Sequence, residues 1–290
     1  MQILIAGHGY LGQPLAEHLA AAGHEVVALT KHEPSESDHR TYPVHSCDVS
    51  NRQEIADLNT SPDAIVHCAS SNRGGPDAYR AVFRDGIRNL SSHFSGIPVF
   101  LTSSTSVYPQ TDGSVVTEES ASKPDRETGQ ILREAEDMLL GNGGTVLRLA
   151  GIYGPNRSVY LKRFLEGSAT IESGEVSRFL NQIHVEDAIS AIHHLLDRPA
   201  LAKSQIYNVT DGNPITQRAC FEWLAEHFDK PVPPESPADM NRKRAWTNKQ
   251  ISNEKLKSAG WKPEYPDFFE AVKHDPELVL SLREVSSESD

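Results

Sequence analysis

Short, largely apolar runs alternate with stretches of helical periodicity through the first half of the chain. Runs typical of buried strands cover residues 3–6, 24–29, 41–45, 64–69, 98–102 and 146–149. Apolar residues recur at helical spacing over 13–22, 52–58, 77–94 and 127–140. Continuous apolar strands separated by helices predict an α/β fold, a doubly wound parallel sheet with helices on both faces.

The alternation loosens after residue 150, where residues 153–174 mix helix and loop. The elements predicted beyond them are a helix at 183–196, a strand at 204–209, an amphipathic helix at 216–228 and a short helix at 252–259. Residues 230–244 are Pro-rich and irregular. The end of the chain is rich in Ser and Glu, which predicts a flexible tail over 279–290.

A glycine-rich turn, Gly7-His8-Gly9-Tyr10-Leu11-Gly12, joins the first predicted strand to the first predicted helix. In a strand–turn–helix–strand context, this G-x-G-x-x-G spacing is typical of a dinucleotide site. Gly7 permits the tight turn, Gly9 lets the backbone approach a pyrophosphate, and Gly12 lets the helix pack on the strand. The helix N-terminus, with Tyr10 and Leu11 before it, offers N–H groups to the phosphates. The alternative is a Gly-rich turn that holds no nucleotide.

The motif predicts a Rossmann-type dinucleotide-binding domain over residues 1–150, completed by 183–210. The looser stretches, 151–182 and 211–278, predict a smaller C-terminal lobe for the substrate. Ligands of doubly wound sheets bind beyond the carboxyl ends of the strands, so we expect this lobe to lie there.

The end of the second predicted strand distinguishes the two nicotinamide cofactors. An acidic residue there binds the ribose 2′-hydroxyl of NAD, whereas a basic one accommodates the 2′-phosphate of NADP. Thr30 and Lys31 follow the strand, with no acid until Glu33, so the sequence favours NADP. The alternatives are that Lys31 is a solvated loop residue and that NAD is bound. Other expected cofactor contacts follow the third and fourth strands: Asp48 at the adenine amino group, and Ala69 and Ser70 along the cofactor.

Charge and composition argue against several classes of protein. The 290 residues carry a formal net charge of −12, which disfavours nonspecific binding to nucleic acid or to an anionic membrane. We predict a cytoplasmic protein with reduced thiols, because the sequence has three scattered cysteines, no apolar run of bilayer length and a strand at its very start. The thirteen histidines include His193-His194, but no H-x-x-x-H stands near carboxylates, so we expect no metal.

Further segments support a resemblance that runs from Gly7 to about Val272. Residues 103–108 read SSTSVY, 147–155 read LRLAGIYGP, 181–188 read NQIHVEDA and 260–263 read GWKP. The first three resemble the S-S-x-x-V-Y-G, R-x-x-x-x-Y-G-P and I-H-V-x-D segments of extended short-chain dehydrogenases/reductases of the NAD-dependent epimerase/dehydratase type, and the fourth also fits this family. In the first segment, Pro109 stands where the family has Gly. The resemblance implies a nicotinamide cofactor, a small-molecule substrate and a homodimer formed through the long helices.

The chain departs from this family at its catalytic Y-x-x-x-K pair, which falls on Thr128 and Leu132. In the family the Tyr is the general acid/base, and the Lys lowers its pKa. A Thr hydroxyl is far too weak an acid for this role near neutral pH, and Leu132 has no polar group to offer. The departure is similar to an atypical subgroup, the YeeZ-like proteins, and it argues against the standard mechanism.

Other site residues are implied by the resemblance alone, except Arg157, a basic residue that could meet the diphosphate of a nucleotide sugar. Ser104 matches the family Ser/Thr that hydrogen-bonds the reacting oxygen, with a simple strand-end Ser as the alternative. Tyr108 could serve as a substitute acid, although its family counterpart supports the loop. Tyr153, Arg157 and His184 are candidate substrate contacts, with packing as the alternative for Tyr153 and His184.

Two functions of different class are consistent with these residues. The first is an NAD(P)-dependent epimerase/dehydratase-like oxidoreductase that acts on a sugar or nucleotide-sugar substrate with a degenerate Y-x-x-x-K site. The second is a catalytically inactive NADP(H)-binding sensor or regulatory protein. A lyase or isomerase that uses the nucleotide site for another purpose is a third, weaker alternative.

Overall fold

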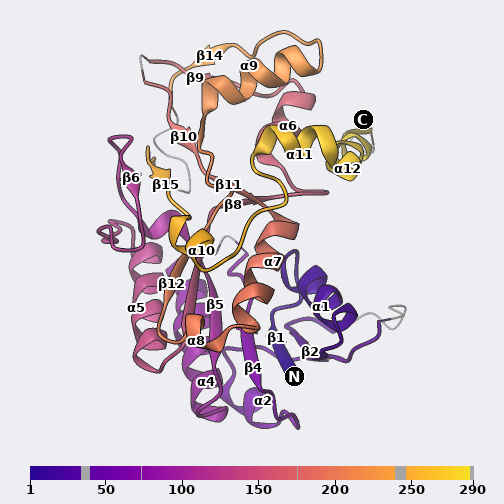
Figure 1. Cartoon of the computed structure of the whole chain (residues 1–290), viewed down its shortest axis with the longest axis vertical. Helices are drawn as coiled ribbons and strands as arrows, with labels where there is room; N and C mark the ends of the chain where they lie inside the picture. The colour runs from indigo at the N-terminus through magenta and orange to yellow at the C-terminus, as the bar shows by residue number, and fades with distance from the viewer. Residues whose placement is uncertain (34–39, 73, 175, 239–245, 288–290) are drawn as a thin grey trace. The chain divides into compact units, whose positions relative to one another are not determined.

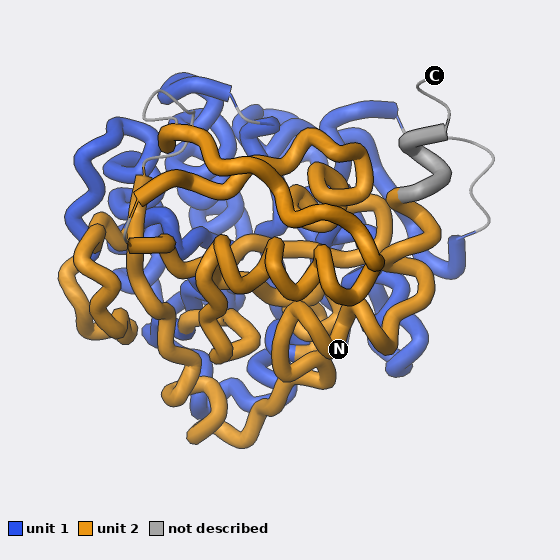
Figure 2. Tube along the Cα trace, turned by 90° about the horizontal axis from the view of Figure 1, so that it is seen from above, with its two compact units in different colours: residues 1–107, 122–148, 191–207 blue, residues 108–121, 149–190, 208–290 orange. Residues whose placement is uncertain are grey.

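The computed structural model describes residues 1–33, 40–72, 74–174, 176–238 and 246–287 (Figure 1). The chain divides into two compact units, each built from three separate segments (Figure 2). Unit 1 comprises Met1–Val107, Ser122–Arg148 and Ala191–Tyr207, and unit 2 comprises Tyr108–Ala121, Leu149–Ser190 and Asn208–Asp290. Within the described residues, every helix is too short or too polar to cross a membrane.

Unit 1 is organised around a seven-stranded sheet. Its strands are β1 (Gln2–Ala6), β2 (Glu25–Thr30), β3 (Val44–Ser46), β4 (Ala64–His67), β5 (Val99–Ser104), β7 (Thr145–Leu149) and β12 (Ile206–Val209). They are ordered β12-β7-β5-β4-β1-β2-β3, and the pairs from β3 to β5 are parallel. The α/β doubly wound prediction is therefore confirmed. The strand order reverses direction between β1 and β4, the place where such sheets bind ligands.

Helices accompany the strands of unit 1 much as the periodicity predicts. They are α1 (Gly12–Ala21), α2 (Arg52–Ala56), α3 (Pro76–Tyr79), the π-helical η1 (Arg80–Asp85), α4 (Gly86–His93), the 3₁₀ turn η2 (Thr105–Val107), α5 (Glu127–Gly141), α8 (Pro199–Ala202) and, from Ala191 onward, α7 (Val185–Leu196). Leu15 and Leu19 of α1, and Ile87 and Leu90 of α4, are fully buried. The predicted helix 77–94 is present, but its middle is wound as a π-helix.

Unit 2 contains short strands and four helices that share a core. Its elements are β6 (Val115–Val116), β8 (Gly151–Tyr153), α6 (Val159–Leu165), β9 (Ile171–Glu172), β10 (Phe179–Leu180), β11 (Gln182–His184), β13 (Ile215–Thr216), α9 (Gln217–His227), β14 (Glu235–Ser236), β15 (Gln250–Ile251), α10 (Glu254–Ser258), α11 (Phe268–His274) and α12 (Pro276–Ser287). The strands form two-stranded pairs: β8 with β11, β9 with β14, β6 with β15 and β10 with β13. Helices α6, α9, α11 and α12 surround buried Leu161, Phe164, Phe221, Leu224 and Phe268.

Three expectations about boundaries need correction. Residues 279–287, predicted as a flexible tail, continue helix α12 because Leu278 and Leu282 are buried in the core of unit 2. Residues 183–190 cluster with unit 2, whereas 191–207 cluster with unit 1. Residues 108–121, predicted within the dinucleotide-binding domain over 1–150, cluster with unit 2, where strand β6 pairs with β15.

Candidate cofactor and active site

The glycine turn between β1 and α1 is packed so tightly that two of its positions require glycine. Gly7 has φ of +109°, and a Cβ on it would lie 2.3 Å from the backbone nitrogen of Ala69. A Cβ on Gly12 would lie 1.9 Å from the carbonyl oxygen of Gly7. The turn therefore sits directly against the chain that follows β4, and this places Ala69, a predicted cofactor contact, beside the turn.

Gly9 is the exposed member of the turn. A Cβ on Gly9 would meet no atom within 4 Å, so the backbone can be approached from this side. Helix α1 begins three residues later with no side-chain cap and no acidic residue in its first turn. An uncapped helix N-terminus carries partial positive charge and attracts an anion. These residues fit the pyrophosphate of a dinucleotide.

Residues around the turn hold it in place. Tyr10 is half-buried and Leu11 is buried. The His8 Nε2 atom lies 3.0 Å from the Tyr42 hydroxyl, which links the turn to the chain before β3. Sequence reasoning missed this contact, since no local pattern joins residues so far apart. Ser70, the last of the predicted contacts here, exchanges hydrogen bonds with the backbone and side chain of Asn72.

Lys31 and Asp48, predicted separately as cofactor contacts, form an ion pair. Lys31 Nζ lies 2.7 Å from Asp48 Oδ2, and the lysine side chain stays 70% exposed. Burial alone would raise the pKa of Asp48, but hydrogen bonds from Lys31 and Ser50 outweigh it and lower that pKa. The bond to Asp48 in turn raises the pKa of Lys31. A charged, accessible ammonium therefore stands beyond half-buried Thr30, at the end of β2.

Ser104 lies at the carboxyl end of β5, where it was predicted. It is half-buried, and its Oγ accepts a hydrogen bond from the backbone N–H of Ser106 at 3.1 Å. Because the oxygen is the acceptor in that bond, the hydroxyl proton can be donated to a ligand. Thr128 is half-buried on α5. Leu132 is 2% exposed and belongs to the packed interior.

A buried ionic network that sequence reasoning missed stands beside this strand end. Arg148 Nη2 donates to Glu136 Oε2 at 2.6 Å, and both side chains are almost completely buried. Ser103 and Arg133 also donate to the Glu136 carboxylate. The network joins β5, α5 and β7, and so fixes the strand that carries Ser104. The family motif containing Arg148 was a signal, but it does not identify the partner.

The structure buries Tyr108, which was considered above as a substitute acid. Its side chain is fully buried in unit 2, and its hydroxyl donates to Asn208 Oδ1 at 2.9 Å. Its carbonyl accepts a hydrogen bond from the buried Lys249 Nζ at 2.5 Å. Burial lowers the pKa of Lys249 to about 8. These contacts correspond to the loop-supporting role and leave no accessible phenol for acid catalysis.

Tyr153 and His184 also pack inside unit 2. His184 Nε2 lies 3.1 Å from Asp275 Oδ2, and its ring stands between those of Tyr153 and Tyr265. Burial holds the pKa of His184 below its ordinary value, although Asp275 acts in the opposite direction. Burial and nearby carboxylates raise the pKa of Tyr153. Both side chains are therefore packed in the interior, whereas Arg157 is exposed.

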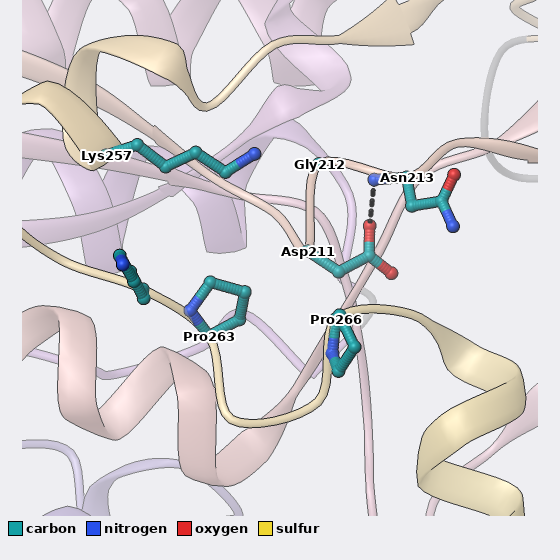
Figure 3. Close-up of a pocket in the computed structure, with 7 residues that line it drawn as sticks. Asp211, Gly212, Asn213, Lys257, Pro263 and Pro266 are labelled. Carbon is teal, nitrogen blue, oxygen red and sulfur yellow. Dashed lines mark hydrogen bonds between the residues drawn. The ribbon is translucent and has the colours of Figure 1, made fainter.

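Unit 2 contains a hollow of about 470 Å³ next to the end of β12 (Figure 3). Its lining residues are Asp211, Gly212, Asn213, Lys257, Lys262, Pro263 and Pro266. Asp211 is 4% exposed, and its carboxyl accepts a hydrogen bond from the backbone N–H of Asn213 at 3.0 Å. Burial, assisted by Asp267 and Asp187, raises the pKa of Asp211 to about 8. The hollow thus combines a carboxylic acid that is largely protonated near neutral pH with two lysines.

Known proteins match the chain over most of its length. The sequence model of a family described as NAD dependent epimerase/dehydratase matches residues 3–210. Protein YeeZ of Escherichia coli (strain K12) is 30% identical over 283 residues, which cover 92% of this chain and 97% of that protein. A 3-diazoavenalumate denitrifying reductase of Streptomyces is 26% identical over 308 residues, which cover 92% and 98%.

Solved structures agree with this comparison. A Methylobacillus flagellatus protein that carries the same family description is 28% identical, with a TM-score of 0.78 over 97% of this chain and 98% of that one. A UDP-glucose 4-epimerase of Thermus thermophilus, solved in complex with NAD, is 22% identical, with a TM-score of 0.80 over 98% and 99%. At that identity the second likeness shows the fold alone, which is Rossmann-type.

Proposed function

The chain belongs to the NAD-dependent epimerase/dehydratase family, and from that membership we propose that it is an NAD(P)-dependent oxidoreductase of the epimerase or dehydratase type, acting on a sugar or nucleotide-sugar substrate. The glycine turn carries the proposal. Gly7 and Gly12 are packed too closely for any side chain, while Gly9 leaves the backbone open beside the uncapped start of α1. When bound there, the nicotinamide cofactor would accept or donate a hydride.

NADP is the proposed cofactor, with NAD as the alternative. Lys31 supports NADP, because its ammonium is exposed and charged at the end of β2, where a 2′-phosphate would need a cation. Asp48 holds that ammonium from one side and accepts two hydrogen bonds from Ser50. The family description and the NAD complex of the Thermus thermophilus protein support the alternative.

Ser104 is the proposed catalytic residue of unit 1. Its hydroxyl would hold the reacting oxygen of the substrate, while the Glu136–Arg148 network keeps β5 in place. The proton would have to move through a group other than residue 128, since a Thr hydroxyl does not titrate in the useful range. Arg157, exposed in unit 2, remains a candidate contact for an anionic part of the substrate.

The degenerate pair favours a second candidate, an NADP(H)-binding sensor without turnover. Thr128 cannot act as the tuned acid, and Leu132 is packed in the interior, where it offers no charge to a ribose. Tight cofactor binding with no turnover across a broad panel of carbonyl and sugar-nucleotide substrates would favour this candidate over the enzyme.

Cofactor titration followed by nicotinamide fluorescence tests the first step. We expect NADPH to bind more tightly than NADH, and Lys31→Ala to weaken NADPH about tenfold while NADH is unaffected. Gly9→Val should abolish binding without unfolding the chain, because its side chain would occupy the side of the turn that a pyrophosphate needs. Gly141→Ala, at the end of α5 with no atom near its Cβ, is the matched control and should bind normally.

Two results of this titration would contradict the proposal. Absence of binding for both cofactors at millimolar concentration would overturn the dinucleotide site. Tighter binding of NADH than NADPH would overturn the assignment of Lys31 alone.

A further inference from the structure

Three histidines and one aspartate in unit 1 form a cluster that the proposed function does not use. His18 lies on α1, and His24 lies in the turn before β2. His193 belongs to α7, and Asp197 follows one helical turn later. The backbone N–H of Asp197 donates to the His193 carbonyl at 3.1 Å, so the two residues share a helix face. We call these four residues the histidine cluster.

The spacing of the ligand atoms suits a metal ion. His24 Nε2 and His193 Nε2 are 3.4 Å apart, and His193 Nε2 and Asp197 Oδ2 are also 3.4 Å apart. All three atoms lie within 4.8 Å of one another. Tetrahedral zinc with bonds of about 2.0–2.1 Å to nitrogen and oxygen places neighbouring ligand atoms roughly 3.3–3.5 Å apart. The three atoms could therefore surround one ion after a small adjustment.

His18 supplies the outer contact that metal-binding histidines usually have. His18 Nε2 and His193 Nδ1 are 2.9 Å apart, within hydrogen-bond distance. When Nδ1 of His193 donates in this bond, the lone pair of His193 remains on Nε2, the atom next to His24 and Asp197. Such a bond fixes the tautomer and the orientation of a ligating imidazole.

The donor set is also suitable. The three ligand atoms come from two imidazoles and one carboxylate. Such a nitrogen-rich set suits zinc, nickel or cobalt better than magnesium or calcium.

We propose that His24, His193 and Asp197 bind one divalent transition-metal ion, for which zinc is the probe, with His18 as a positioning residue. The sequence predicted no metal site because it has no H-x-x-x-H near carboxylates. Here the helical pair is His193-x-x-x-Asp197, and the third ligand comes from a distant turn.

The proposed ion would have a structural role. It would link α7 to the short turn between α1 and β2, which is far from α7 in the sequence. His24 precedes β2 and Lys31 follows it, so the six residues of that strand separate the ion from the cofactor site by roughly 20 Å. Loss of the ion should therefore reduce stability and leave cofactor binding intact.

Zinc binding to the untagged full-length chain tests the site. The protein, stripped with chelator and dialysed, is titrated with Zn²⁺ in competition with a chromophoric chelator. We expect one site in the wild type, a loss of affinity of 100-fold or more in His193→Ala, and a loss of roughly tenfold in His18→Ala. His194→Ala, the adjacent residue outside the cluster, is the matched control and should bind zinc like the wild type. Equal affinity in the wild type and His193→Ala would overturn the proposal.

Thermal unfolding gives an independent measurement. Zn²⁺ should raise the Tm of the wild type and of His194→Ala, because an ion that binds only the folded state stabilises it. It should not raise the Tm of His193→Ala or Asp197→Asn. An equal rise in all four proteins would place the ion elsewhere and refute the site. NADPH titration of His193→Ala distinguishes this proposal from the proposed function, since its cofactor binding should be unchanged.

Discussion

Ser103 and Ser104 are neighbours on β5 with opposite surroundings. Ser103 is buried and donates to Glu136, whereas Ser104 is half-buried and accepts only from its own turn among the hydrogen bonds described. Successive residues of a strand point to opposite faces, so one serine ties the strand to the interior while the other can meet a ligand. Substitution of Ser103 and substitution of Ser104 should therefore have different effects.

Turnover should depend on Ser104 and be nearly independent of Thr128. Loss of one hydrogen bond that strengthens in the transition state lowers kcat by roughly 100-fold or more, and we expect this for Ser104→Ala. Thr128→Ala, the control on α5, should change kcat by less than about threefold. The comparison is of steady-state rates once a substrate has been found. A large loss in Thr128→Ala with normal rates in Ser104→Ala would reverse the assignment.

Asp211 should make the stability of the chain fall as the pH rises. Its pKa is about 8 in the folded chain and near 3.8 when unfolded, so between these values the folded state holds a proton that the unfolded state has lost. The free energy of unfolding therefore decreases from about pH 4 to about pH 8, by up to roughly 1.4 kcal/mol per pH unit. Asp211→Asn should flatten this slope in denaturant titrations at a series of pH values.

Asp77→Asn is the control for that measurement, because Asp77 is fully exposed and should leave the slope unchanged. Asp187, whose pKa burial raises to about 6, acts in the same direction and should preserve part of the slope in Asp211→Asn. If the free energy of unfolding changes with pH by the same slope in the wild type and in Asp211→Asn, Asp211 is ionised in the folded chain.

At this scale, sequence reasoning places residues correctly where the pattern is local. The positions of the glycine turn and of Ser104 at the end of β5 follow from short patterns, because the residues that define them are adjacent in the chain. The partner of Arg148, the contact between His8 and Tyr42 and the histidine cluster join segments far apart in the sequence. Only the tertiary structure brings those side chains together.

Helices and strands were predicted well where they are long and buried. The apolar spacing over 77–94 identified the helix, but it could not show that Arg80–Asp85 is wound as a π-helix. There the buried His67 Nε2 lies 3.0 Å from the carbonyl oxygen of Val82, and burial lowers the pKa of His67 to about 4. The neutral imidazole therefore donates to that carbonyl. The two-residue strands of unit 2 were missed because an alternating pattern needs more residues to be visible.

Two helix-end glycines should respond in opposite ways to alanine. A Cβ on Gly12 would lie 1.9 Å from the Gly7 carbonyl oxygen, so Gly12→Ala must displace α1 from β1 and should cost about 1–3 kcal/mol. Gly141 ends α5 with no atom within 4 Å of such a Cβ, so Gly141→Ala should gain about 0.4–1 kcal/mol. Urea unfolding measures both. Equal effects would show that the turn relaxes around the new methyl group.

The ion pair between Glu136 of α5 and Arg148 of β7 should have the energetics of a buried ion pair. Arg148→Met leaves Glu136 buried without its main partner and should cost about 3–5 kcal/mol in the free energy of unfolding. The double variant Glu136→Leu/Arg148→Met should recover most of this loss, because no charge is then left buried. Denaturant titration of the two single variants and the double variant completes the cycle. A double variant less stable than either single one would contradict the desolvation argument.

At the scale of the whole molecule, the two units contain different kinds of architecture. Unit 1 has a continuous sheet whose central strands are fully buried, and apolar patterning alone predicted it. Unit 2 relies on two-stranded pairs and on helices around a shared core, and it buries the carboxyls of Asp187 and Asp211. We therefore expect unit 2 to be the less stable part, especially above neutral pH.

Buried cysteines can report on each unit separately. Cys47 in unit 1 and Cys220 in unit 2 are both buried. Burial raises the pKa of the Cys47 thiol to about 11 and that of the Cys220 thiol to about 12. Both thiols should therefore react slowly in the native chain. In increasing urea at pH 8, Cys220 should become reactive at a lower concentration than Cys47, as measured by pulsed alkylation and mass spectrometry. Identical midpoints would mean that the two units unfold as one.

Each unit is assembled from three separate segments of chain, and this order matters while the protein is being made. On the ribosome, Met1–Val107 emerges well before Ala191–Tyr207, which carries α8 and half of β12, the edge strand beside β7. Strand β7 ends at Leu149, so at roughly 5–20 residues per second about 3–12 s pass between its emergence and that of Tyr207. During that time β7 lacks its outer neighbour, and an open strand edge can pair with another nascent chain. A message truncated before codon 207 would therefore yield an aggregation-prone product rather than a self-contained first unit.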